Sequence, residues 1–166
     1  MKSLVIIPTY NEAENIASIV AAVCAEVPSI EILVVDDNSP DGTGRIVESM
    51  QVTNPKLHIL KRPGKQGLGR AYLAGFEWGL KSGFEILVEM DADFSHRPAD
   101  LRKILMAAQD VDFVVGSRYV PGGATVNWGL MRKIISRGGS LYSRLILGYP
   151  LRDWTGGFNA WRRSVL

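Results

Sequence analysis

The chain has 166 residues, which is enough for one domain with a full hydrophobic core. Its 46% hydrophobic and 22% charged residues are ordinary for a soluble globular fold and exclude the disordered and collagen-like classes. A net charge of +2 is too small to indicate a nucleic-acid partner. The single cysteine, Cys24, excludes an intrachain disulfide and favours a reducing compartment, and no segment approaches the roughly 20 apolar residues of a membrane span.

The first half of the chain alternates apolar strands with amphipathic helices, which indicates an α/β fold with a mostly parallel sheet and helices on both faces. Strands are predicted over residues 4–7, stopping at Pro8, and over 32–35, 57–60, 86–90 and 111–115. Helices are predicted after Asn11, which forms a capping box with Glu14, and over 43–51, 67–80, from Pro98 onward and over 130–147. Residues 153–158 form a turn-rich segment, and residues 162–166 show no pattern typical of a further element.

Polar residues directly follow four of the predicted strands, at 8–12, 36–41, 91–95 and 116–118. The carboxyl ends of parallel strands lie at one edge of a sheet, and ligands of open α/β sheets bind there. We therefore expect these four segments to converge on one site.

The acidic pair after the fourth predicted strand is the sharpest feature of the sequence. Asp91 and Asp93 leave a buried strand, so both carboxylates can turn toward one hard cation such as Mg²⁺ or Mn²⁺. The alternative is a turn in which an Asp caps the following helix, and for the pair taken alone the two interpretations are about equal. Because unpaired buried carboxylates are costly without a cation, we favour a metal site.

The second predicted strand also ends in acidic residues. We expect Asp37 to contact a ligand through a nucleobase N–H or ribose hydroxyls, with a second metal site as the alternative. Its polar neighbours are expected to shape the turn: Asp36, Asn38 and Asp41. Tyr10 can stack on a base and Glu12 can accept a hydrogen bond from it, although an exposed helix start explains both residues about as well.

Arg118 and Arg132 are candidate phosphate contacts because a guanidinium fork matches phosphate oxygens. On the helix predicted over 130–147, basic and apolar residues occupy opposite faces: Arg132, Lys133, Arg137 and Arg144 on one, and Met131, Ile134, Ile135, Tyr142, Leu145 and Ile146 on the other. Such a helix can lie on an anionic membrane surface. Packing on the domain itself is the alternative, and Gly138-Gly139 can break the helix into two.

Other familiar motifs carry little weight. The segment 64–69 is rich in glycine but lacks the Gly-Lys-Ser/Thr ending of a phosphate loop, so it indicates at most a minor role near a nucleotide. His58 and His96 are not spaced as metal ligands, and we expect His96 to belong to a helix-start turn. No His-Ser-Asp or Cys-His arrangement supports hydrolase chemistry.

Six motifs occur in a specific order over almost the whole chain: VIIPTYNE (5–12), VVDDNSPDGT (34–43), MDADFSH (90–96), GSRY (116–119), RKIIS (132–136) and DWTGGF (153–158). In this combination the sequence resembles the family 2 glycosyltransferases with the GT-A fold, and most of all the dolichol-phosphate and polyprenol-phosphate mannose synthases. The resemblance implies a nucleoside site made by the following residues: Pro8, Tyr10, Glu12, Val35 and Asp37.

The resemblance also implies that Asp91 and Asp93 bind the metal and that Ala92 lines the nucleotide pocket. Ser95 stands where some relatives carry a glutamine that completes the metal shell, and its hydroxyl is the third candidate ligand. Because a serine hydroxyl is a shorter and poorer ligand, water in that place is the alternative. The resemblance further implies that Arg118 and Arg132 grip phosphate groups, including that of the acceptor. Together with Asp93 they are the residues expected to act most directly in catalysis.

The implied reaction moves mannose from GDP-mannose to a polyprenyl or dolichyl monophosphate, with inversion and assisted by Mg²⁺ or Mn²⁺. The acceptor implies peripheral contact with the cytoplasmic face of a membrane and a membrane-anchoring partner or domain outside this chain. Since an anionic phosphate needs no strong general base, Asp153 is expected to anchor the turn 155–157, and a role as base or orienting group is the alternative if the acceptor is a hydroxyl. Relatives usually continue with basic residues that bind the donor diphosphate, so residues 1–166 are expected to form a single GT-A catalytic domain without its C-terminal part.

Two other functions remain open from the sequence. A sugar-phosphate nucleotidyltransferase also joins a metal to a nucleotide on a similar sheet, but it normally begins with a glycine- and arginine-rich loop after the first strand. A non-catalytic nucleotide-sugar-binding module is the alternative from another class. Pyrophosphate release would identify the first, and nucleotide binding without turnover would identify the second.

Overall fold

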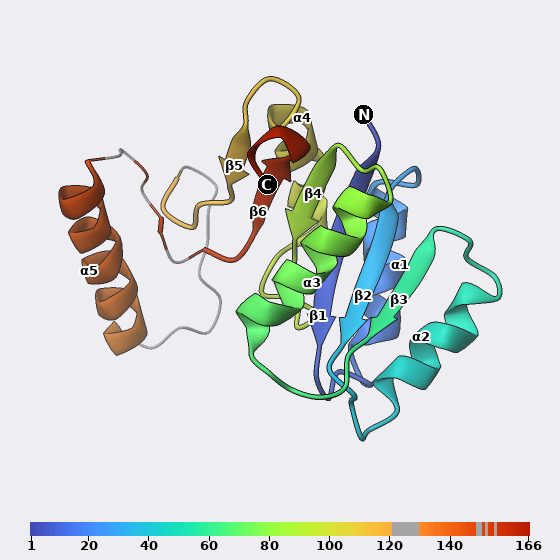
Figure 1. Ribbon diagram of the computed structural model, residues 1–166. Helices are drawn as coiled ribbons and strands as arrows, with labels where there is room; N and C mark the ends of the chain where they lie inside the picture. The colour runs from blue at the N-terminus through green and yellow to red at the C-terminus, as the bar shows by residue number, and fades with distance from the viewer. Residues whose placement is uncertain (121–129, 149–150, 152, 155) are drawn as a thin grey trace.

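The computed structural model describes residues 1–120, 130–148, 151, 153–154 and 156–166, with the backbone alone for residues 130, 132–135 and 137. Its centre is a six-stranded sheet in the order β3-β2-β1-β4-β6-β5 (Figure 1). The strands are β1 (Ser3–Thr9), β2 (Glu31–Asp36), β3 (Leu57–Lys61), β4 (Ile86–Glu89), β5 (Phe113–Val115) and β6 (Asn159–Arg162). The first four strands pair in parallel, whereas β6 is antiparallel to both β4 and β5. The expected α/β class with a mostly parallel sheet is confirmed.

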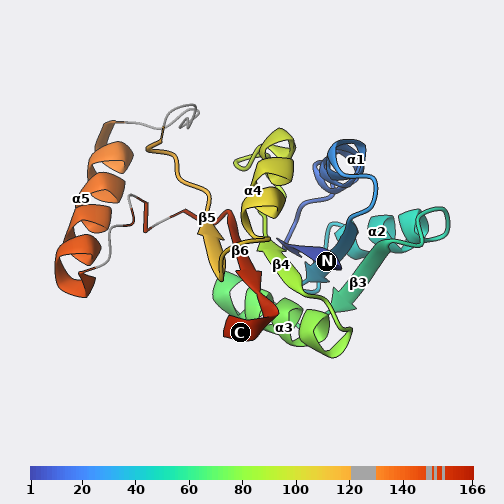
Figure 2. The ribbon, with the colours of Figure 1, turned by 90° about the horizontal axis from the view of Figure 1, so that it is seen from above.

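Helices cover both faces of the sheet, as predicted. Figure 2 shows α1 (Ile16–Glu26), α2 (Thr43–Gln51) and α4 (Leu101–Ala107) on one face, with the short 3-10 helix η1 (Pro98–Asp100) leading into α4. Helix α3 (Leu68–Lys81) covers the opposite face, near the terminal 3-10 helix η2 (Arg163–Val165). Each face carries its own apolar core, because alternate residues of a strand point to opposite sides.

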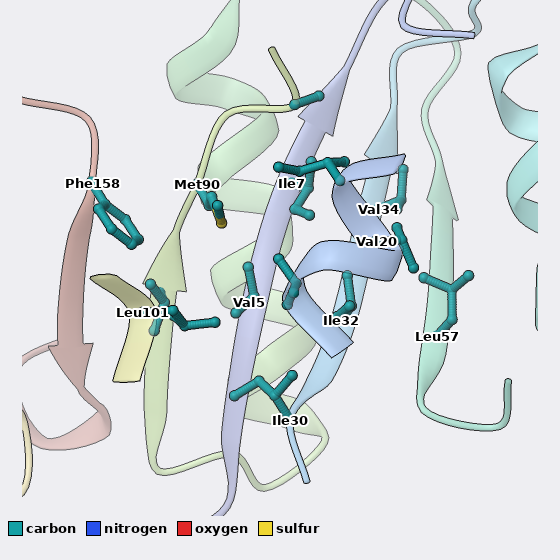
Figure 3. Close-up of a cluster of buried hydrophobic side chains, with 14 of the residues drawn as sticks. Val5, Ile7, Val20, Ile30, Ile32, Val34, Leu57, Met90, Leu101 and Phe158 are labelled. Atoms are coloured by element: carbon teal, nitrogen blue, oxygen red, sulfur yellow. The ribbon is translucent and has the colours of Figure 1, made fainter. Parts of the chain in front are cut away.

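The larger core lies under α1. Figure 3 shows apolar side chains of β1, β2, β3 and α1 meeting there, with Met90, Leu101 and Phe158 closing the cluster on the β4 side. Val5, Ile7 and Val34 are fully buried within it. The smaller core lies under α3 and includes Leu4, Ile6, Leu33, Val35 and Tyr72. The central strands are therefore buried on both faces, as their continuous apolar runs indicate.

Helix α5 (Leu130–Leu147) has the bounds predicted for it and continues through Gly138-Gly139. Both ribbon views place it beyond the β5 edge of the sheet, apart from the helices that cover the two faces (Figures 1 and 2). No helix in the described part of the chain combines the length and apolarity needed to cross a bilayer.

Two predicted boundaries after the first strand are wrong. β1 continues through Pro8 to Thr9, and Pro8 lies opposite Val35 in the ladder with β2. The pairing of β1 with β4 ends at Ile6, so Pro8 interrupts no ladder on that side. Asn11 is not a helix cap: its φ is 61°, and α1 begins five residues later at Ile16.

The expectation of no terminal element is also wrong, because residues 159–162 form β6 and residues 163–165 form η2. Glu89 of β4 accepts hydrogen bonds from Asn159 Nδ2 at 2.7 Å and Trp161 Nε1 at 3.3 Å. Burial raises the pKa of Glu89, and these two donors offset part of that effect. A strand of mixed polarity was missed because its partner strands, β4 and β5, come from segments far away in the sequence.

Gly75 lets α3 approach the sheet closely, so we predict that Gly75→Ala destabilises the fold. A Cβ at Gly75 lies 2.5 Å from Ile6 Cγ2, a fully buried β-branched side chain. Overpacking of this kind costs about 1–3 kcal/mol, which urea unfolding measures. The matched control is Gly69→Ala on the same helix, where an added Cβ meets nothing within 4 Å. It should leave stability unchanged or raise it by up to about 1 kcal/mol; equal losses in both variants would contradict the packing argument.

Candidate functional site

A cleft of about 260 Å³ opens at the carboxyl ends of β1, β2 and β4. Residues from all three strand ends line it, together with the start of α3: Pro8, Thr9, Tyr10, Glu12, Asp37, Lys65, Gly67, Leu68, Ala71, Asp91, Ala92 and Asp93. The predicted convergence of strand ends is therefore confirmed for three of the four segments. Seven of the predicted site residues lie in this one cleft: Pro8, Tyr10, Glu12, Asp37, Asp91, Ala92 and Asp93.

The loops after β1 and β2 hold each other in place. Three consecutive backbone N–H groups, at residues 11–13, donate to Ser39 Oγ, Thr43 Oγ1 and Asp41 Oδ2 at 2.9–3.1 Å. Asp36 accepts hydrogen bonds from Thr9 Oγ1 at 3.0 Å and from Ser39 Oγ at 2.5 Å. Asp36 and Asp41 thus shape the turn, as predicted, and the donors near the start of α1 have side-chain partners.

Asp37 lines the cleft as one half of a buried ion pair. Its Oδ1 accepts from Arg62 Nη1 at 2.8 Å, and the two side chains are only 6% and 9% exposed. Lys65 Nζ lies 4.3 Å from the centroid of the Tyr10 ring. The segment after β3 therefore forms part of the cleft wall beside the residues that follow β1. A neutralised carboxylate with fixed orientation suits hydrogen bonding to a base or ribose better than binding a second metal.

Asp91 is held from two directions. Tyr72 Oη of α3 donates to Asp91 Oδ1 at 2.9 Å. The Asp91 backbone N–H donates to His96 Nδ1 at 3.0 Å, so the neutral imidazole carries its proton on Nε2, 3.8 Å from Asp91 Oδ2. Burial lowers the pKa of His96. The pKa of Tyr72 is raised, mainly by burial and to a smaller extent by the charge of Asp91. Both side chains are therefore neutral at neutral pH.

Asp93 sits in a tight turn on the rim of the cleft. Its carboxylate accepts from the Ser95 backbone N–H and from Ser95 Oγ, both at 2.9 Å, and Phe94 between them has a φ of 60°. A turn is thus present, but it is not the helix cap that the alternative required, because η1 begins at Pro98 without a side-chain cap. It does not exclude a cation, because each carboxylate oxygen has a second lone pair.

The residues present fit Mg²⁺ or Mn²⁺ bound together with a diphosphate. Within the described residues, no three His, Cys, Asp or Glu side chains gather as a ready-made metal site. Asp91 and Asp93 nevertheless line the same cleft. Mg²⁺ typically takes one or two protein carboxylates and completes its shell with water and substrate phosphates, which is the ligand number available here.

Arg118, expected to grip phosphate, forms a two-pronged ion pair with the fully buried Asp153. Arg118 Nε and Nη2 each donate to a carboxylate oxygen at 2.7 Å, and the Arg118 backbone N–H adds a third bond at 3.0 Å. The hydrogen bond with Asp153 raises the pKa of Arg118. Asp153 thus orients the arginine, and the hydroxyl of Ser136 on α5 lies 3.4 Å from the same Nη2.

Glycines let the segment before β6 reach the strand ends. A Cβ at Gly116 lies 2.6 Å from the carbonyl oxygen of Phe158, and one at Gly156 lies 3.0 Å from the carbonyl oxygen of Gly116. A Cβ at Gly157 lies 3.3 Å from His96 Cε1 and 3.7 Å from Asp91 Oδ2. The segment 156–157 therefore runs between the Arg118–Asp153 pair and Asp91, and side chains would not fit there.

Val35 and Ser95 are not among the residues that line the cleft. Val35 is fully buried in the core under α3, so only its backbone is near the strand end. Ser95 donates to Asp93 instead of standing beside it as a separate ligand. Arg132 belongs to α5, and its side chain is outside the described residues.

Three residues of the site were missed: Arg62, Lys65 and Tyr72. Arg62 follows β3 directly, so the strand-end rule that found the acidic residues could have found it. Lys65 lies in the glycine-rich segment 64–69, for which the sequence predicts at most a minor role near a nucleotide. Tyr72 offered no local signal, because it looks like one of the apolar residues on the buried side of a helix.

The sheet order and the acidic cleft at its edge define a GT-A-type domain. A solved mannosyltransferase from Pyrobaculum calidifontis, in complex with GDP-Man and Mn²⁺, shares this fold with a TM-score of 0.66 at 22% identity, over 99% of this chain and 45% of that one. Residues 4–166 match the family described as Glycosyl transferase family 2. The chain belongs to that family.

Two curated relatives are each 50% identical to the chain. One is a polyprenol monophosphomannose synthase of Mycolicibacterium smegmatis, matched over 99% of this chain and 63% of the relative. The other is an undecaprenyl-phosphate mannosyltransferase of Micrococcus luteus, matched over 100% of this chain and 68% of the relative. The chain thus spans about two thirds of the length of these relatives.

The Arg118–Asp153 pair leads us to predict that Asp153→Asn destabilises the domain by about 3 kcal/mol, because the substitution removes a fully buried carboxylate that accepts two charge-assisted hydrogen bonds from the guanidinium. Urea unfolding measures the loss. Asp110→Asn is the control, since Asp110 is exposed and its substitution should change stability by less than about 0.5 kcal/mol. A similar small change in both variants would show that the ion pair contributes little.

Proposed function

We propose that the protein transfers mannose from GDP-mannose to a polyprenyl monophosphate, with inversion at the anomeric carbon and with the help of Mg²⁺ or Mn²⁺. The observation that carries this proposal is the single cleft that joins Tyr10 and Asp37 at one side to Asp91 and Asp93 at the other. Such a cleft suits a ligand with a base at one end and a diphosphate at the other. The names of the two 50% identical relatives support mannose as the sugar and a polyprenyl phosphate as the acceptor.

At the nucleoside end, Asp37 can accept from a base N–H or a ribose hydroxyl, while its ion pair with Arg62 fixes the orientation of the carboxylate. The exposed edge of Tyr10 offers a surface for stacking, and Lys65 beside it adds a positive charge near the phosphates. This end therefore binds and orients the donor.

At the diphosphate end, Asp91 and Asp93 would hold the divalent cation. A bound cation of this kind offsets the negative charge that develops on the departing nucleoside diphosphate. A lipid phosphate is already an anion at neutral pH, so it can attack the anomeric carbon without a protein base. Asp153 keeps Arg118 oriented in the loop after β5, where its guanidinium can contact an acceptor phosphate.

We predict that Asp91→Asn and Asp93→Asn each reduce sugar transfer by roughly 10³-fold, because both weaken the cation site on which leaving-group stabilisation depends. The assay supplies radiolabelled GDP-mannose and polyprenyl phosphate and measures label in the organic phase.

Asp112→Asn, at an exposed position, is the control and should keep full activity. Label that stays in the aqueous phase with the unmodified protein would contradict a lipid acceptor. Calorimetry of GDP and UDP with and without Mn²⁺ tests the base separately, and tighter binding of UDP would overturn the choice of guanine.

Helix α5 has an exposed apolar surface, which is compatible with a lipid acceptor. Six of its apolar side chains are each more than half exposed: Met131, Leu141, Tyr142, Leu145, Ile146 and Leu147. Residues 130–147 contain four basic residues and no acidic one. Since exposed apolar area is costly in water and basic residues are attracted to anionic lipid, α5 is suited to lie on the cytoplasmic face of a membrane.

We predict that the double variant Leu145→Glu with Ile146→Glu weakens binding to phosphatidylglycerol vesicles by at least tenfold, because burying one such side chain contributes about 1.5–3 kcal/mol. Vesicle co-sedimentation measures this. Val52→Glu replaces an equally exposed apolar residue after α2 and should leave binding unchanged. Unaltered binding of the α5 variant would show that this surface does not face lipid.

A further inference from the structure

The metal-site carboxylate of Asp91 receives a hydrogen bond from a buried phenol that the proposed reaction does not use. Tyr72 Oη lies 2.9 Å from Asp91 Oδ1, while the Tyr72 side chain as a whole is only 6% exposed. Asp91 itself is partly open to the cleft, with 32% of its side chain exposed. The bond therefore connects the buried core under α3 to a ligand at the surface of the cleft.

The position of Tyr72 is fixed by packing. Its ring stacks against Phe76 one helical turn later, with 6.4 Å between the ring centroids, and it belongs to the apolar core under α3. Gly75 keeps this helix close to β1, so the helix cannot shift without moving Ile6.

Resting on the function proposed above, we propose that Tyr72 is a positioning residue that orients Asp91 for the divalent cation. The phenol binds Oδ1 and limits rotation of the carboxylate, so that Oδ2 stays on the side of His96. The carboxylate of Asp91 is then already ordered in the folded protein, so it loses less conformational entropy when the cation binds. Partners of this kind typically change metal affinity by about 10–100-fold.

The position of Tyr72 on α3 adds a link to the donor. Gly67, Leu68 and Ala71, at and just before the first turn of the same helix, line the cleft. One rigid helix thus contributes to the wall of the nucleotide cleft and holds the metal ligand. Tyr72 is therefore expected to affect the metal-dependent part of nucleotide binding and to leave the metal-independent part unchanged.

The test is Tyr72→Phe, which removes the hydroxyl and keeps the ring in the core. Electron paramagnetic resonance of Mn²⁺ in the presence of GDP measures the cation affinity, which should fall about tenfold or more. Calorimetry of GDP in the presence of EDTA should give the same affinity for the variant and the unmodified protein. The transfer rate should be reduced at limiting Mn²⁺ and restored at saturating Mn²⁺, whereas general damage to the fold would lower it at both.

Tyr119→Phe is the matched control, because it removes another phenol hydroxyl, one that donates to Ser136 Oγ at 2.9 Å and not to Asp91. Its Mn²⁺ affinity should be unchanged. An unaltered Mn²⁺ affinity in Tyr72→Phe, or an equal loss of GDP affinity with EDTA, would overturn the role of Tyr72. If the unmodified protein binds no Mn²⁺ with GDP, or if Asp91→Asn binds it equally well, the proposed function itself fails, which is a separate outcome.

Discussion

The parallel pairing of β1 with β2 and with β4 is the constraint on which the site depends. Thr9 lies opposite Asp36, so β1 and β2 end at the same level, and Glu89 lies opposite Ile6, so β4 ends three residues earlier at the same edge of the sheet. Each chain segment leaving that edge must turn back toward a helix, which exposes polar backbone and favours polar side chains. Residues separated by more than 80 positions in the sequence, such as Tyr10 and Asp91, therefore line the same cleft.

Carboxylates crowd at this edge, and the structure gives most of them a different partner. Asp36 and Asp41 bind hydroxyls and backbone N–H groups of the loops, Asp37 binds Arg62, and Asp153 binds Arg118. Burying a charge without such a partner is costly. Each of these carboxylates therefore stays bound to its partner and is less suited to bind a cation. In the part of the chain that the structure describes, Asp91 and Asp93 accept hydrogen bonds from the neutral side chains of Tyr72 and Ser95. They are consequently the carboxylates best suited to a divalent ion.

The last third of the chain completes the site from the other side of β4. β6 enters antiparallel between β4 and β5, and glycines before it allow Asp153 to reach Arg118 while Gly157 lies beside Asp91. Ser136 and Ser140 connect α5 to Tyr119 and Trp154 by hydrogen bonds. An exposed apolar helix is thus attached near the arginine expected to contact an acceptor phosphate, which is consistent with a lipid substrate approaching from α5.

The sequence by itself determined the α/β class, the bounds of α2 and α5, and the acidic pair, because apolar periodicity and strand-end polarity are local properties of the chain. It also indicated the convergence of the strand ends through the geometry of parallel sheets. Only the tertiary structure decided that Asp37 pairs with Arg62, that Tyr72 binds Asp91, and that residues 159–162 form a strand. These features depend on contacts between segments far apart in sequence, and a single side chain carries no local signal of which distant partner it will meet.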